Sequence, residues 1–233
     1  AGEHTSAALQ WELAHEASRA ARSWNSAGEY RRAAILWDST GDHAEAAQAW
    51  ERDGELTEAA RRWEAAGDYE RAAVLWADAG CHDLAAQAFE HAGKLDRAAS
   101  EWEVAGDKRR AIEAWQTAGC HDQTARLWED LGEPANAAAA WAQACQYAAA
   151  ASTWHDLGDH GLAAQAWHAA GEHEAAASEW ESAGEVARAA ESWSTAGMPQ
   201  RAAPRFTAVS IRSRCAAIEA NPPSMSPDHM AYA

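Results

Sequence analysis

The sequence predicts an all-α fold, an α-solenoid of about 15–16 short antiparallel helices. Three observations lead to this prediction. A tryptophan or phenylalanine recurs every 13 residues along most of the chain, a glycine follows four residues after nearly every one, and a pair of small residues precedes it. Such a pattern is typical of helices that are too short to be stable alone and that stack on their neighbours.

The aromatic residues set the register of the repeat. Trp76 lies 13 residues after Trp63, and Phe89 takes the place of the next tryptophan. An indole buries about 200 Å², worth up to about 5 kcal/mol, and alanines on a neighbouring helix would leave room for it. We therefore expect the whole series to form the structural core: Trp11, Trp24, Trp37, Trp50, Trp63, Trp76, Phe89, Trp102, Trp115, Trp128, Trp141, Trp154, Trp167, Trp180 and Trp193.

Each unit is expected to be one helix of about eleven residues followed by a turn of about two. Counting from the glycine as position 0, small or apolar residues occupy positions 2, 5, 6, 9 and 12, which share one helix face. In the unit that starts at Gly67, the first four of these are Tyr69, Ala72, Ala73 and Trp76. Position 1 is usually acidic, which suits a helix N-terminus, and the next glycine suits the left-handed end of a helix.

Two units lack the glycine, and a few polar positions are expected to be ordinary. His15 and Cys145 stand at position 0 of their units, where the turn favours a left-handed residue. Glu103 follows Trp102 on the polar side of its helix, so we expect an ordinary surface carboxylate there.

The repeats are expected to form one domain over residues 1–209, with units that begin at Gly2 and a last unit that is degraded. Pro204 falls inside that last unit, where it would disturb a helix. Five of the six prolines and all three methionines lie in residues 198–233. We expect the tail of residues 210–233 to hold a capping helix at most, followed by a disordered or extended end.

The units resemble the second helix of tetratricopeptide repeats. The segment GDYERAAVLWADA carries the glycine, aromatic, small, large aromatic and small residues of that helix at Gly67, Tyr69, Ala72, Trp76 and Ala79. The resemblance covers residues 2–209 and implies a TPR-like superhelix that binds partner proteins. The family alternates two helix types over about 34 residues, whereas one helix type recurs here, so the family's peptide groove does not carry over residue by residue.

Charge and cysteine content narrow the classes of partner. The net charge of −17 argues against nucleic acid, which needs clustered Lys and Arg, and no apolar run is long enough to span a membrane. We therefore expect neither a nucleic-acid nor a membrane partner. Cys81, Cys120, Cys145 and Cys215 show no CxxC spacing. Free thiols in a reducing compartment are expected, hence a cytoplasmic protein.

Four histidines are the strongest candidates for metal ligands. His155, His160, His168 and His173 alternate between positions 10 and 2 of successive units. Position 10 lies at the edge of the apolar face and position 2 lies on it, which argues against convergence on one ion. The sequence therefore gives no metal site, cofactor or catalytic residue, and these histidines are read as packing residues.

A stripe of apolar residues is a candidate contact surface. Ile35 and Val74 occupy the outward position 7, and each is followed by a leucine, Leu36 and Leu75. The function we expect is a non-enzymatic helical-repeat scaffold that acts through protein–protein contacts. It would either assemble end to end into a homo-oligomer or filament, or dock a partner protein. The alternative is a peptide-binding TPR-like adaptor domain of a larger multidomain protein.

Overall fold

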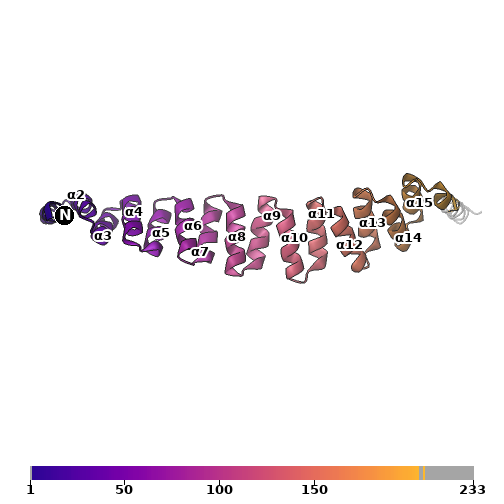
Figure 1. Ribbon diagram of the computed structural model, residues 1–233, viewed down its shortest axis with the longest axis horizontal. Coiled ribbons are helices and arrows are strands. Elements are labelled where there is room, and N and C mark those ends of the chain that lie inside the picture. Colours follow the sequence, from indigo (N-terminus) through magenta and orange to yellow (C-terminus); the bar gives the residue numbers. More distant parts are fainter. Residues whose placement is uncertain (1, 205–206, 208–233) are drawn as a thin grey trace, which may run out of the picture. The chain divides into compact units, whose positions relative to one another are not determined.

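The computed structural model describes residues 2–204 and residue 207, which form short helices joined by tight turns (Figure 1). The helices are α1 (Gly2–Leu13), α2 (Ala17–Ala27), α3 (Tyr30–Thr40), α4 (His43–Asp53), α5 (Leu56–Ala65), α6 (Tyr69–Asp78), α7 (His82–His91), α8 (Leu95–Ala105), α9 (Lys108–Ala118), α10 (His121–Asp130), α11 (Pro134–Gln143), α12 (Tyr147–Asp156), α13 (His160–Ala169), α14 (His173–Ser182) and α15 (Val186–Thr195).

The predicted fold class is confirmed. The chain is all-α, and its short helices pack in sequential antiparallel order with a period of about 13 residues. Residues 199–204, including Pro204, are also helical. The expected capping helix and extended end at 210–233 lie outside the described residues. Among the residues that are described, no helix has both the length and the apolar character needed to cross a membrane.

The described residues divide into two compact units, a first unit that ends at residue 124 and a second that begins at residue 125, and the boundary falls within α10. In the first unit, each helix from α1 to α8 packs against the next helix in the sequence. In the second unit, α11 to α15 follow the same rule. Neighbouring helices in sequence are therefore neighbours in space, as a stack of repeats requires.

Left-handed residues end the helices. Gly28 has φ 86°, its N–H bonds to the Asn25 carbonyl at 3.2 Å, and the next N–H, of Glu29, bonds to the Trp24 carbonyl at 3.0 Å. This is the Schellman arrangement, which satisfies carbonyls at the helix end. His15 (φ 58°) and Cys145 (φ 60°) take the same conformation without being glycine, so the fold imposes the turn on them.

The core consists of alanine pairs with aromatic rings between them. Ala72 and Ala73 are fully buried, and one cluster joins such alanines to Trp63, Trp76 and Phe89. The aromatic residues of the series that are buried are Trp24, Trp37, Trp50, Trp63, Trp76, Phe89, Trp102, Trp180 and Trp193. The others are only half-buried: Trp11, Trp115, Trp128, Trp141, Trp154 and Trp167. Position 9 alone therefore does not guarantee burial.

The apolar stripe divides between surface and core. Ile35 and Val74 are 55 % and 43 % exposed. Leu36 and Leu75, one residue later, are partly buried and pack against the core clusters. In α3 and α6, the stripe therefore offers one exposed apolar side chain each, at position 7. The leucine at position 8 of each helix packs against the core instead.

Candidate functional site

Many of the tryptophan rings are held by a carboxylate of the preceding helix. In α8, the Trp102 indole N–H donates to Glu90 Oε1 at 2.8 Å, and Glu90 lies at position 10 of the unit before. The same bond, always to the residue 12 positions earlier, recurs along both units. The pairs are Trp24–Glu12, Trp50–Asp38, Trp63–Glu51, Trp76–Glu64, Trp102–Glu90, Trp115–Glu103, Trp141–Glu129 and Trp193–Glu181. The bond satisfies a donor that would otherwise be buried unpaired.

These acceptors were missed by the sequence analysis, which placed Glu103 among ordinary surface carboxylates. Glu103 instead accepts the hydrogen bond of the Trp115 indole. A signal existed in the recurring Trp–Glu dipeptide. Phe89, which has no N–H, follows a unit with Ala77 in the acceptor position. In this pair of units, neither the donor nor the acceptor of the hydrogen bond is present.

Arginine from the following helix covers many of the same rings. The Arg71 guanidinium lies 4.6 Å from the centre of the Trp63 ring, and Arg110 lies 4.6 Å from that of Trp102. Both arginines occupy position 4, eight residues after the aromatic. The other pairs with this spacing are Trp11–Arg19, Trp24–Arg32, Phe89–Arg97, Trp180–Arg188 and Trp193–Arg201. Such cation–π contacts contribute roughly 0.5–1 kcal/mol at partly exposed sites.

The repeat also produces equivalent surface hollows. In the first unit, one hollow of about 290 Å³ lies over Trp63 of α5, between α4 and α6. A second, of about 380 Å³, lies over Phe89 of α7, between α6 and α8. Their linings correspond at a shift of 26 residues, or two units, and Val74 belongs to both. In the second unit, a hollow over Trp180 has the same lining positions.

The two hollows of the first unit have acidic rims. Glu51 and Glu70 border the hollow over Trp63. Asp78, Asp96 and Glu101 border the hollow over Phe89. One arginine faces each hollow, Arg71 and Arg97 respectively. Carboxylates therefore outnumber guanidinium groups around both, and apolar atoms of Val74 lie between them.

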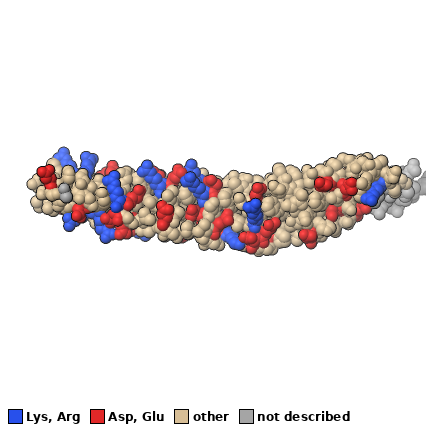
Figure 2. Space-filling view, viewed as in Figure 1, with Lys and Arg blue, Asp and Glu red and all other residues tan. Residues whose placement is uncertain are grey.

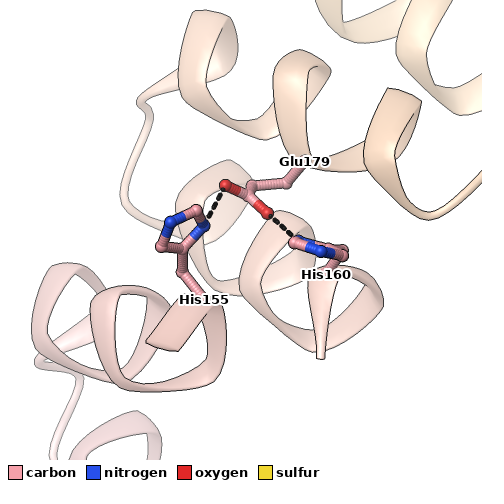
Figure 3. A group of neighbouring side chains, drawn as sticks. All are labelled: His155, His160 and Glu179. Atoms are coloured by element: carbon pink, nitrogen blue, oxygen red, sulfur yellow. Dashed lines mark hydrogen bonds and ion pairs between the residues drawn. The ribbon is translucent and has the colours of Figure 1, made fainter. Parts of the chain in front are cut away.

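The four candidate histidines form two pairs. His155 lies in the last turn of α12, His160 is the first residue of α13, and their ring centroids are 5.9 Å apart. The rings of His168 and His173 lie on either side of the next turn, with their centroids 5.0 Å apart. Positions 10 and 2 converge because they flank the same tight turn, which the face argument from sequence did not consider. The sequence analysis also missed Glu179 of α14, whose two oxygens lie 2.8 Å from His155 Nδ1 and His160 Nδ1 (Figure 3).

The cysteines within the described residues are free thiols: Cys81, Cys120 and Cys145. Cys145 is exposed, and its Sγ accepts a hydrogen bond from the Tyr147 hydroxyl at 3.6 Å. This hydrogen bond raises the pKa of Tyr147. Cys215 lies outside the described residues.

These features define a class: a helical-repeat protein of single-helix units, many of which have an aromatic side chain in contact with a carboxylate or an arginine of a flanking helix. No protein-family model matches the sequence, and no curated protein sequence matches it. Among solved structures, the crystal structure of BtubC (BKLC) from P. vanneervenii is 16 % identical, covering 95 % of this chain and 85 % of that chain, with a TM-score of 0.21. At this level of identity and superposition, BtubC indicates nothing about what this chain binds.

Proposed function

We propose that the chain is a non-enzymatic scaffold that docks a partner protein in the row of hollows over Trp63 and Phe89. The observation that carries the proposal is the recurrence of the same hollow at a two-unit step, with the exposed Val74 shared between both copies. A repeated hollow can accept repeated side chains of one partner segment. The proposal includes no catalytic step. What recurs on this surface is a set of open hollows with charged rims.

Charge indicates the chemistry of the partner. The rims of both hollows carry more Asp and Glu than Arg, and the whole chain has a net charge of −17. A partner segment with Lys or Arg would be attracted and oriented by this potential. Aliphatic groups beside those cations would contact Val74 and the aromatic floors. The partner we propose is therefore a basic, partly aliphatic peptide segment of another protein.

The step between hollows sets the spacing of that segment. Helices that pack side by side are about 8–10 Å apart. A polyproline-II segment rises about 3.1 Å per residue with three residues per turn, so every third side chain points the same way at a spacing of roughly 9 Å. We expect the partner to place its anchoring side chains three residues apart.

The experiment is selection of a random dodecapeptide phage library on the chain, followed by binding measurements on the enriched peptides. We expect enrichment of Lys or Arg together with aliphatic residues at a three-residue spacing, and affinity that falls as salt increases. Val74→Asp should reduce the affinity of these peptides by at least about tenfold. Val104→Asp is the matched control, because Val104 is 64 % exposed and borders neither hollow.

Two outcomes would overturn the proposal. One is the enrichment of peptides that bind the wild-type chain and Val74→Asp equally well. The other is no selective enrichment from a chain whose helical content is intact. Light scattering over a range of protein and salt concentrations tests the other expectation, end-to-end assembly, which would appear as a mass that grows with protein concentration.

A further inference from the structure

The second unit contains a buried carboxylate in an unusual position. Glu179 is the one charged residue of the described part of the chain that is buried, and its side chain is 12 % exposed. The next residue, Trp180, belongs to a core cluster with Ala164 and Ala189. A buried charge is costly unless it is paired. Here both carboxylate oxygens face imidazole nitrogens, one from His155 and one from His160.

We propose that His155, His160 and Glu179 bind a divalent transition metal ion, for which Zn²⁺ is the probe. Two imidazoles and one carboxylate are ligands typical of Zn²⁺ sites that keep a coordination position open. Imidazole nitrogens also favour Zn²⁺, Cu²⁺ and Ni²⁺ over Mg²⁺ and Ca²⁺, which prefer oxygen ligands. The proposal concerns a different surface from the hollows over Trp63 and Phe89 and does not depend on them.

The distances require a local rearrangement of the three side chains. One ligand atom from each residue lies within 4.8 Å of the other two, and the two Nδ1–oxygen distances are 2.8 Å. Ligands at the usual 2.0–2.2 Å from a tetrahedral Zn²⁺ are about 3.3–3.6 Å apart, so the widest separation would have to close and the two hydrogen-bonded contacts would have to open by less than about 1 Å. His155 has the freedom to close this gap, because its side chain is 55 % exposed and lies at the end of α12. Its exposure also gives the ion a path from solvent.

Binding would replace two hydrogen bonds by bonds to one ion. Each imidazole would bind as the neutral ring with its proton on Nε2, so that the Nδ1 lone pair points at the metal, while the Glu179 carboxylate partly neutralises the charge of the ion. The ion would then join α12, α13 and α14, three consecutive helices that otherwise contact one another through alanine and aromatic side chains. Water or a side chain of another protein could occupy the remaining position.

The repeat supplies two incomplete copies of the same arrangement. Residues at the spacing 155, 160 and 179 recur as Ala77, His82 and Glu101 in the first unit, where His82 Nδ1 lies 2.8 Å from Glu101 Oε2. They recur again as His168, His173 and Ser192 in the second unit. The copy in the first unit has Ala77 in place of the first histidine, and the copy in the second unit has Ser192 in place of the carboxylate. Each becomes a complete set after one substitution, Ala77→His or Ser192→Glu.

The first experiment is titration of the untagged full chain with ZnCl₂ by isothermal calorimetry, with melting curves in parallel. We expect one ion per chain and a higher Tm, because Zn²⁺ binds the folded state. His155→Ala, His160→Ala and Glu179→Gln should each weaken binding by at least about tenfold. His82→Ala should leave it unchanged, because His82 belongs to a two-ligand pair.

The second experiment adds a site instead of removing one. Ala77→His and Ser192→Glu should each raise the stoichiometry from one ion to two, whereas Ala77→Gln and Ser192→Gln should not. The wild-type chain binding no Zn²⁺ while circular dichroism shows intact helices would overturn the proposal. So would binding that His155→Ala leaves unchanged, since the ion would then lie elsewhere. In either case the three residues form a hydrogen-bonded cluster without a metal.

Discussion

Trp63 in the first unit and Trp154 in the second occupy the same position of their repeats but have different surroundings. The Trp63 indole donates to Glu51 and is covered by Arg71, and the ring is 3 % exposed. The positions that correspond for Trp154 hold Ala142 and Leu162, and Trp154 is only half-buried. The comparison teaches that the repeat fixes the position of the ring, whereas residues of the flanking units decide whether the ring has a carboxylate acceptor and a covering arginine.

The difference extends over several helices. No Lys or Arg occurs between Arg126 and Arg188, so α11, α12 and α13 have no arginine to cover their rings. Figure 2 shows basic side chains spread over the first unit, while none is visible on α11–α13. Within this stretch, Trp141, Trp154 and Trp167 are all half-buried. The same stretch contains His155, His160, His168 and His173.

The largest expected effect is the removal of a clasped ring. Trp102 is 2 % exposed, with Glu90 and Arg110 on either side, so Trp102→Ala should lower the free energy of unfolding by at least about 3 kcal/mol. Trp154→Ala removes a half-buried ring and should cost roughly 1–2 kcal/mol. Denaturant unfolding followed by circular dichroism measures both. Equal losses would contradict the difference between the two regions.

Removal of an indole acceptor should have the next largest effect. Glu90→Ala leaves the Trp102 N–H without its partner and should cost about 1–2 kcal/mol, the usual penalty for a buried unpaired donor. Glu113→Ala is the control, because Glu113 is exposed at the outward position 7 of α9 and should cost under about 0.5 kcal/mol. If the two losses match in urea unfolding, the Trp–Glu bond adds nothing to stability.

A change in the turn before α12 should stabilise the second unit. Cys145 has φ 60°, a conformation that glycine adopts without strain, so Cys145→Gly should raise the free energy of unfolding by up to about 1 kcal/mol. Gly158→Ala, at φ +76° with open space around the added methyl group, should lower it by about the same amount. A loss of stability in Cys145→Gly would mean that the contact with Tyr147 outweighs backbone strain.

The smallest effect is a gain made by copying the first unit into the second. Ala142→Glu places an acceptor 12 residues before Trp154 and should stabilise the chain by about 0.5–1 kcal/mol. Ala148→Glu, an exposed site in α12 away from the acceptor position, should change stability little. Thermal unfolding of the two variants side by side tests whether the acceptor alone improves the weaker region. Equal Tm values would indicate that Trp154 needs a covering side chain as well.

The fold follows from sequence because period, face and helix end are local properties. The spacing of Tyr69, Ala72, Ala73 and Trp76 fixes one helix face, and the glycine after it fixes the turn. Contacts between units depend on how neighbouring helices cross, which spacing within one unit does not specify. Glu103 therefore looked like a surface carboxylate, although the recurring Trp–Glu dipeptide was visible in the sequence.

The candidate site was predictable only in part for the same reason. His155 and His160 were identified from their spacing, but their convergence depends on the turn between α12 and α13. Glu179 reaches them from a helix two units later than His155, at position 8, which has no distinctive residue type along the repeat. A single sequence gives no reason to connect a carboxylate at that position with histidines 19 and 24 residues earlier.

The most direct test of the account is a double-mutant cycle on Glu90 and Trp102, read as the free energy of unfolding in urea. Phenylalanine has no N–H, and the chain itself pairs Phe89 with Ala77. We expect Glu90→Ala to cost about 1–2 kcal/mol in the wild-type chain but under about 0.5 kcal/mol after Trp102→Phe, a coupling of about 1 kcal/mol. The same cost for Glu90→Ala in both backgrounds would contradict the claim that the preceding helix holds the Trp102 ring through its N–H.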